Sequence, residues 1–201
     1  NYDLIVISSG DNTETINNGP VQEAIMLHLN AGKSVLLEGG EVGYDHRENE
    51  VGAALGISSW NSDGPSDLTL NTSLSGQLLS SPYQLPPSIG ITGTGGFSDW
   101  GTQDQLSLSG NQIELYYTDG SSNVFVNSYQ NGHIGLIANN LDAFDEDSHK
   151  TAVVANMAKY LIDATFTGID DDATQMSGQF RLNGNFPNPF NPSTQISFYI
   201  P

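Results

Sequence analysis

The stretch that decides the expected fold is Ser34-Val35-Leu36-Leu37-Glu38-Gly39-Gly40-Glu41-Val42-Gly43-Tyr44-Asp45. Its first half is a short apolar run typical of a buried strand, and its glycines predict a tight turn before a polar helix start. In open α/β sheets, ligands and catalytic groups usually lie at the carboxyl end of such a strand. The sequence therefore places its candidate site at this turn, with Glu41 at the tip.

The preceding segments predict a parallel strand pair joined by a helix. Residues 2–8 contain a continuous apolar run, which is typical of a strand covered on both faces. Asn18-Gly19-Pro20 is a helix start, because proline in the first turn loses no hydrogen bond, and Gly32 is a natural helix end. A strand, a helix and a second strand between residues 2 and 38 indicate a right-handed parallel crossover. A short helix is expected next, over residues 48–55.

Further along, the pattern predicts a loop-rich β insertion and then a return to the sheet. Residues 58–111 are rich in Gly, Ser, Pro, Asn and Thr around short apolar pieces, which indicates short strands and loops. Residues 113–117 and 123–129 alternate around a turn, so a hairpin is expected. A strand over 133–138 and a helix from about Asp147 to about Ile162 complete an α/β fold, a mostly parallel sheet flanked by helices.

The charge balance excludes several classes of partner. The 201 residues carry 23 acidic and five basic side chains, a net charge of −18. Nucleic acids and anionic membranes need clustered Lys and Arg, so neither is expected as a partner. No apolar run is long enough for a membrane span. Because the chain contains no cysteine, disulfides, thiolate nucleophiles and Cys-based zinc sites are excluded.

The C-terminal segment carries the most specific motif, Asn185-Phe186-Pro187-Asn188-Pro189-Phe190-Asn191-Pro192-Ser193-Thr194, followed by an alternating strand. It closely resembles the start of the C-terminal sorting domain of type IX (Por) secretion cargo. The resemblance implies an all-β immunoglobulin-like unit beginning at residue 180, which would continue beyond Pro201. It also implies the secretion machinery as a partner, and a secreted or cell-surface protein that passes through the periplasm. An acidic linker is expected over residues 164–179.

The body, residues 1–163, resembles class I glutamine-amidotransferase-like domains, which have a flavodoxin-like fold. The resemblance is carried by residues 2–7, 32–45 and 133–162. It implies one more strand and helix before Asn1. In active members the turn reads Gly-x-Cys-x-Gly, whereas Gly39-Gly40-Glu41-Val42-Gly43 puts Glu41 at the nucleophile position. A His and a Glu would follow the last strand, but residues 138–142 contain neither, so amidotransferase activity is not expected.

Two interpretations of the turn are open. Glu41, Asp45 and His46 form a local cluster that could supply a general base or a metal ligand. Alternatively, the Glu41 carboxylate caps the following helix or binds backbone amides in the turn, where the helix dipole favours negative charge. The latter interpretation is the favoured one.

Other candidate ligand sites are weaker. Two acidic segments offer oxygen ligands for calcium, although neither follows the twelve-residue loop pattern and both also suit solvated surfaces. Their residues are Asp142, Asp145 and Asp147 in one, and Asp11 to Glu14 in the other. Trp60, Phe97 and Trp100 would either stack sugars or plug the insertion. No other cofactor is expected.

The expected function is a non-catalytic structural or binding module of a secreted, cell-surface multidomain bacterial protein. Its other partners would be further domains or copies of the same protein. The alternative is a degenerate or peptidase-associated hydrolase that uses the cluster at the turn.

Overall fold

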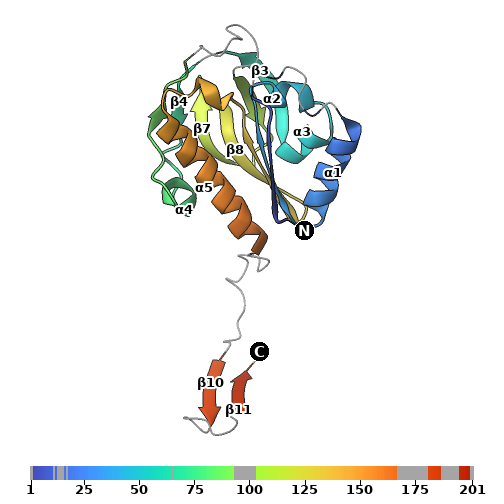
Figure 1. Cartoon of the computed structure of the whole chain (residues 1–201), viewed down its shortest axis with the longest axis vertical. Helices are drawn as coiled ribbons and strands as arrows, with labels where there is room; N and C mark the ends of the chain where they lie inside the picture. The colour runs from blue at the N-terminus through green and yellow to red at the C-terminus, as the bar shows by residue number, and fades with distance from the viewer. Residues whose placement is uncertain are drawn as a thin grey trace. The chain divides into compact units, whose positions relative to one another are not determined.

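A mixed β-sheet with helices on both faces forms the body of the protein (Figure 1). The computed structural model describes residues 2–10, 12, 16, 18–64, 66–92, 103–166, 181–186 and 195–199. It divides the chain into two units, Asn1–Phe166 and Thr167–Pro201. Within the described residues, no helix is long and apolar enough to cross a membrane.

The elements of the body follow the order expected from the sequence. The helices are α1 Gly19–Asn30, α2 Val42–His46, α3 Glu50–Leu55, α4 Gln77–Ser80, the 3-10 turn η1 Leu141–Ala143 and α5 Asp147–Phe166. The strands are β1 Leu4–Ser8, β2 Ser34–Glu38, β3 Ile57–Asp63, β4 Leu68–Leu70, β5 Ser88–Ile89, β6 Asp104–Leu108, β7 Ile113–Thr118, β8 Ser121–Tyr129 and β9 Gly132–Ile137. Helix α5 continues past its predicted end near Ile162.

Only one part of the sheet is parallel, so the expectation of a mostly parallel sheet is corrected. The strand order is β1-β2-β9-β8-β7-β4-β5, and β1, β2 and β9 run parallel. The pairs β7–β8 and β8–β9 are antiparallel because tight turns join them in sequence. At the first turn, Asp119 and Gly120 both have positive φ, 46° and 79°, as a two-residue hairpin turn requires.

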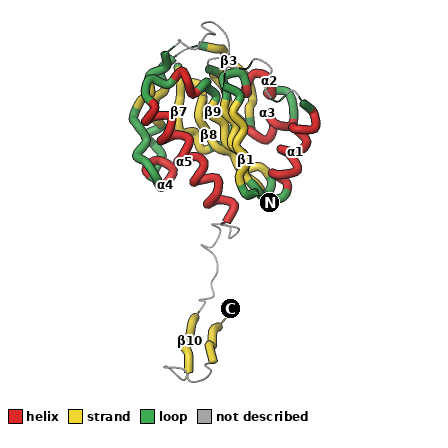
Figure 2. The backbone as a smooth tube through the Cα atoms, viewed as in Figure 1, coloured by secondary structure: helices red, strands yellow, loops and turns green. Residues whose placement is uncertain are grey.

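The two faces of the sheet are covered by different helices (Figure 2). On β2 all five residues are buried: Leu36 packs in the cluster that contains Met157 and Leu161 of α5, and Leu37 in the one that contains Leu29 of α1. Successive side chains of a strand point to opposite faces of the sheet, and here both faces are covered by helices. A central strand such as β2 is therefore apolar along most of its length. The same explanation is wrong for β1, which among the described strands lies at one edge of the sheet, with Val6 52% exposed.

The insertion contains the short strands that its sequence predicts. Strands β3 and β6 pair antiparallel and join the sheet where Leu106 of β6 lies opposite Ser122 of β8. Asn156, a fully buried residue of α5, holds the loop after α4 by accepting from the backbone N–H of Tyr83 and donating to the carbonyls of Leu78 and Tyr83. The amide thereby satisfies backbone groups that have no strand partner.

The second unit contains an antiparallel strand pair, β10 Arg181–Phe186 and β11 Gln195–Tyr199. Asn185 and Phe186 of the sorting motif end β10. The remainder of the motif, residues 187–194, lies outside the described residues. The immunoglobulin-like domain therefore stays a prediction.

Candidate functional site

The turn after β2 lies at the carboxyl end of the parallel strands, as predicted. Gly39, with φ at 150°, donates its N–H to the carbonyl of Ile137 at the end of β9. Gly40 donates to the carbonyl of Gly10, just after β1. A Cβ on Gly39 would come within 2.9 Å of the Ser9 side chain, so only glycine lets the two turns approach so closely. The sequence thus brings the ends of β1, β2 and β9 together.

Glu41 occupies the tip of this turn without backbone strain. Its φ of −110° and ψ of 0° are accessible to ordinary residues, whereas a strained nucleophile turn holds its central residue in an unfavourable conformation. The residue is only 8% exposed. Glu41 is the N-cap residue of α2, but its side chain makes no capping hydrogen bond, so the expectation that its carboxylate caps the helix is wrong. Binding of this carboxylate to backbone amides of the turn stays a prediction. Another carboxylate caps the helix.

Asp104, the first residue of β6, caps α2 across the fold. Its Oδ2 accepts from the N–H groups of Gly43 at 2.8 Å and Tyr44 at 3.1 Å. A Cβ on Gly43 would lie 2.9 Å from this Oδ2, so the missing side chain of Gly43 is what admits the carboxylate. Asp104 supplies the negative charge that the start of a helix favours. The Asp104 carboxylate, at the start of β6, already accepts from the N–H groups of Gly43 and Tyr44, so Glu41 does not cap them.

The environment of Asp104 strongly favours its neutral form. The side chain is fully buried, and Oδ1 has no hydrogen-bond partner among the described residues. Burial raises the pKa of Asp104 well above 3.8, and the charges of Glu41 and Asp63 raise it further, against the lowering effect of the two N–H donors. Sequence reasoning missed Asp104 because it lies 61 residues from Gly43 in a loop-rich segment. The only signal available was an acid at the start of an apolar alternation.

Glu38, the last residue of β2, lies at the carboxyl ends of the parallel strands. Its carboxylate accepts from the Ser8 hydroxyl at 2.5 Å, the Gly10 N–H at 3.3 Å and the Leu141 N–H at 2.9 Å. Only 3% of the residue is exposed. It therefore ties together the loops that follow β1 and β9, at the place where a ligand would sit in an open α/β sheet. Its part in the site was also missed, although it lies in the stretch that suggested the site.

The other two members of the predicted cluster differ in their surroundings. His46 is 1% exposed, and its Nδ1 lies 2.8 Å from Nδ2 of Asn49, the N-cap of α3. Asp45, on the same short helix, is half-buried. Within the described ranges, no three His, Asp or Glu side chains are arranged to hold a metal ion. A catalytic role for Glu41, Asp45 and His46 stays a prediction.

The predicted calcium ligands lie beside basic side chains. Asp142 and Asp147 are 3.6 and 3.1 Å from Nζ of Lys150, and Asp145 is 2.9 Å from Nδ1 of His149. These contacts offer the carboxylates partners other than a cation. In the second candidate segment, Asp11, Thr13 and Glu14 lie outside the described residues. Calcium binding stays a prediction.

Trp60 of β3 belongs to a small aromatic group beside the turn. Its ring meets that of Tyr44 edge to face with centroids 5.1 Å apart, and the Arg47 guanidinium lies 3.9 Å from the centre of the Tyr44 ring. Its Nε1 donates to Asp63 at 3.2 Å. Trp60 also packs against the core on the α1 side of the sheet, which favours the plug over the sugar platform. Phe97 and Trp100 lie outside the described residues.

Comparison with known proteins identifies a similar fold. No family model matches the chain, and a search of curated proteins finds no match. A cytoplasmic protein from Salmonella typhimurium is similar in structure over 80% of this chain and 72% of its own, with a TM-score of 0.55 and 14% identity. A second, from strain LT2, matches over the same shares with a TM-score of 0.56 and 16% identity. The likeness is one of fold alone.

A third structure is a beta-galactosidase from Bacillus circulans sp. alkalophilus. It matches 79% of this chain at 12% identity with a TM-score of 0.49, and the chain spans 23% of that enzyme.

Proposed function

We propose that this chain is a non-catalytic structural or binding module of a secreted, cell-surface multidomain bacterial protein. The observation that carries the non-catalytic part is the placement of Glu38. Its buried carboxylate accepts three hydrogen bonds from the chain itself, at the strand ends where α/β proteins usually bind their ligands. A substrate would have to displace this carboxylate and leave three donors to be satisfied again.

The turn also lacks the parts of a covalent mechanism. Glu41 stands at the position of a nucleophile with an ordinary backbone conformation, and the chain has no cysteine. The residues after β9 are engaged in structure, since Asn139 donates to the Asn123 side chain and Asn140 caps η1 by accepting from the N–H of Asp142. Nothing in these roles activates a nucleophile.

Export by the type IX route is the second half of the proposal, and it rests on the tail. The motif from Asn185 to Thr194 resembles the beginning of a type IX sorting domain. The antiparallel pairing of β10 with β11 supports this proposal, because a β-sandwich is built from such pairs. The high net negative charge suits a surface protein.

A hydrolase remains the alternative function, and one observation favours it. Asp104 has a raised pKa and lies where the charge of Glu41 acts on it. A carboxyl group whose pKa is raised by burial and by the charge of a second carboxyl group is a candidate for general acid–base catalysis.

Substitution at the turn separates the two functions. The wild-type protein and the Glu41→Gln and Asp104→Asn variants would be assayed with panels of ester, amide and glycoside substrates. The proposal expects no turnover above buffer for any of the three. Turnover by the wild type that either substitution lowers at least a hundredfold would establish the hydrolase instead, since a missing general acid or base typically costs that much.

Export is tested separately in a bacterium that has type IX machinery. The natural full-length protein would be compared with a variant carrying Phe186→Ala and Phe190→Ala, by surface labelling and by intact-mass measurement. We expect the variant to accumulate in the periplasm. Equal surface display of both proteins would refute the sorting role of the motif.

A further inference from the structure

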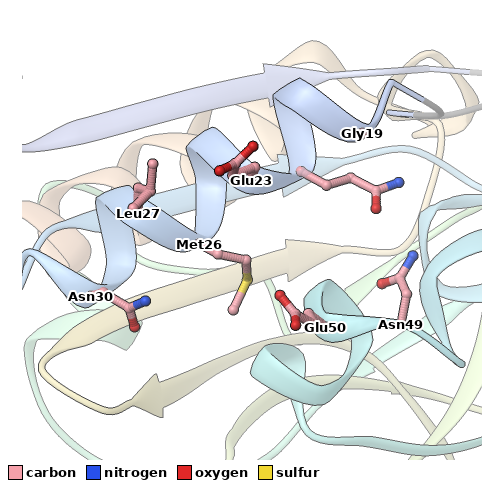
Figure 3. A pocket seen from close by; sticks show the side chains of 8 residues that line it. Gly19, Glu23, Met26, Leu27, Asn30, Asn49 and Glu50 are labelled. Atoms are coloured by element: carbon pink, nitrogen blue, oxygen red, sulfur yellow. The ribbon is translucent and has the colours of Figure 1, made fainter.

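A pocket separate from the turn lies between α1 and α3 (Figure 3). Its volume is about 280 Å³, enough for a small ligand or a single long side chain. Both helices pack on the same face of the sheet. The lining comes from α1 and from the N-terminal end of α3, and it includes neither Glu38 nor Glu41.

The floor of this pocket is apolar. Met26 is 7% exposed and belongs to the core beneath α1, and in Figure 3 its side chain points from α1 toward α3. Leu27 beside it is 63% exposed and also lines the pocket. An occupant with a hydrocarbon portion would remove this apolar surface from water.

The rim of the pocket is negatively charged and unpaired. Glu23 on α1 and Glu50 on α3 both line it and are exposed. Neither has a hydrogen bond or an ion pair within the described part of the chain, and the lining contains no basic residue. Lys33, at the end of the α1–β2 connection, is held by the Asp3 carboxylate at 3.3 Å and the Tyr2 carbonyl at 2.7 Å.

Two amide side chains of the lining, Gln22 and Asn49, make hydrogen bonds within the protein. Gln22 donates through Nε2 to the carbonyl of Ile16 at 3.0 Å, so its oxygen remains available. Asn49 caps α3 with its oxygen, which accepts from Val51 and Gly52, and its Nδ2 faces His46. The acceptors left for a ligand are therefore the Gln22 oxygen and the carboxylates of Glu23 and Glu50, beside one remaining N–H on each of these amide groups.

From this combination we propose that the pocket binds an alkylammonium group, the end of a lysine side chain or of a polyamine. The methylene chain lies over Met26 and Leu27, and the ammonium group lies between the Glu23 and Glu50 carboxylates. An ammonium ion offers three donors and no acceptor, which complements a rim of acceptors. A long cationic side chain normally places its methylenes on apolar surface and its charge at a polar edge. This site goes beyond the proposed function and holds whether or not the protein is exported or catalytic.

The test is a binding titration at low ionic strength with two probes, 1,5-diaminopentane and N-acetyl-lysine amide. Binding would be followed by calorimetry and by the NMR signal of the Met26 methyl group. We expect dissociation constants on the order of millimolar, because the charge pairs are exposed to solvent. Glu23→Gln with Glu50→Gln should weaken binding about fivefold to tenfold, the effect of two exposed pairs. Leu27→Ala should weaken it about twofold to fourfold.

A charge-matched control separates the pocket from the general attraction of an acidic protein for cations. Glu146→Gln with Asp163→Asn removes two exposed carboxylates on the α5 side of the sheet and should change affinity less than twofold. Equal weakening by the two double variants would overturn the site, as would equal shifts of the Met26 signal with ammonium chloride. Binding of the diamine alone would identify a free polyamine as the ligand, and binding of both probes would extend the site to lysine side chains. Binding of neither probe would refute the proposal. Thermal unfolding of each variant confirms that it is folded.

Discussion

Replacing Asp104 with asparagine should remove a pH-dependent cost from the folded protein. Asparagine is a neutral isostere of the protonated acid, and its oxygen can still accept from the N–H groups of Gly43 and Tyr44. Its amide nitrogen would occupy the position of Oδ1, which has no hydrogen-bond partner among the described residues. The variant therefore keeps the helix cap and loses the ionisation.

The sign of the effect follows from the direction of the pKa shift. Burial, with the charges of Glu41 and Asp63, raises the pKa of Asp104 above its usual 3.8 in the folded protein. Above pH 3.8 the unfolded chain releases the Asp104 proton while the folded protein keeps it. The free energy of unfolding therefore falls as pH rises from 3.8 toward the pKa of Asp104 in the folded protein. One proton gives a slope of at most about 1.4 kcal/mol per pH unit.

The assay is chemical and thermal unfolding of the wild type and of Asp104→Asn from pH 4 to pH 9. We expect similar stabilities near pH 4 and a growing advantage for the variant as pH rises. A difference of 1 kcal/mol corresponds to about 2–4 °C in Tm for a domain of this size. Glu23→Gln removes an exposed carboxylate of α1 that has no hydrogen bond or ion pair among the described residues; it is the control and should give a difference that changes little with pH.

Two outcomes would refute the reasoning. Parallel pH profiles would mean that Asp104 titrates alike in the folded and unfolded states. A variant that loses stability relative to the wild type as pH rises would mean that the ionised carboxylate is stabilised by the start of α2 more than burial penalises it.

Three further substitutions test the packing around the turn and the core. Glu38→Ala removes the acceptor of three hydrogen bonds, and urea unfolding should show a loss of about 2–4 kcal/mol; a loss below about 1 kcal/mol would argue against its role as a tie. Gly43→Ala places a Cβ 2.8 Å from the Leu106 side chain and should lower the free energy of unfolding by about 1–3 kcal/mol. Its control is Gly19→Ala, whose Cβ meets nothing within 4 Å and which should be neutral or slightly stabilising. Equal effects of the two substitutions would contradict the close approach of α2 to β6. Met157 is a fully buried residue of α5, and Met157→Ala should lower the free energy of unfolding by about 2–5 kcal/mol. The comparison is Ile162→Ala on the same helix, where the residue is 38% exposed; similar losses would contradict the burial pattern of α5.

The local order of the fold is readable in the sequence. The strand, helix and strand from residue 4 to residue 38, the hairpin of β7 and β8, and helix α5 were all predicted, because periodicity and turn residues act between near neighbours. The glycine turn after β2 was predicted for the same reason, and with it the location of the candidate site. The absence of cysteine excluded thiol chemistry from composition alone.

Only the tertiary structure decided which hydrogen bonds the side chains at the turn make. Asp104 accepts from Gly43 at the start of α2, 61 residues away, and Glu38 accepts from the N–H of Leu141, 103 residues away. The local sequence pattern does not predict such contacts, because they depend on how β6 and β9 are placed in the sheet. The edge position of β1 was hidden in the same way, because an apolar run looks alike whether its strand has one neighbour or two. The sequence located the turn by itself, and the long-range approach of two carboxylates determined that it is closed by its own chain.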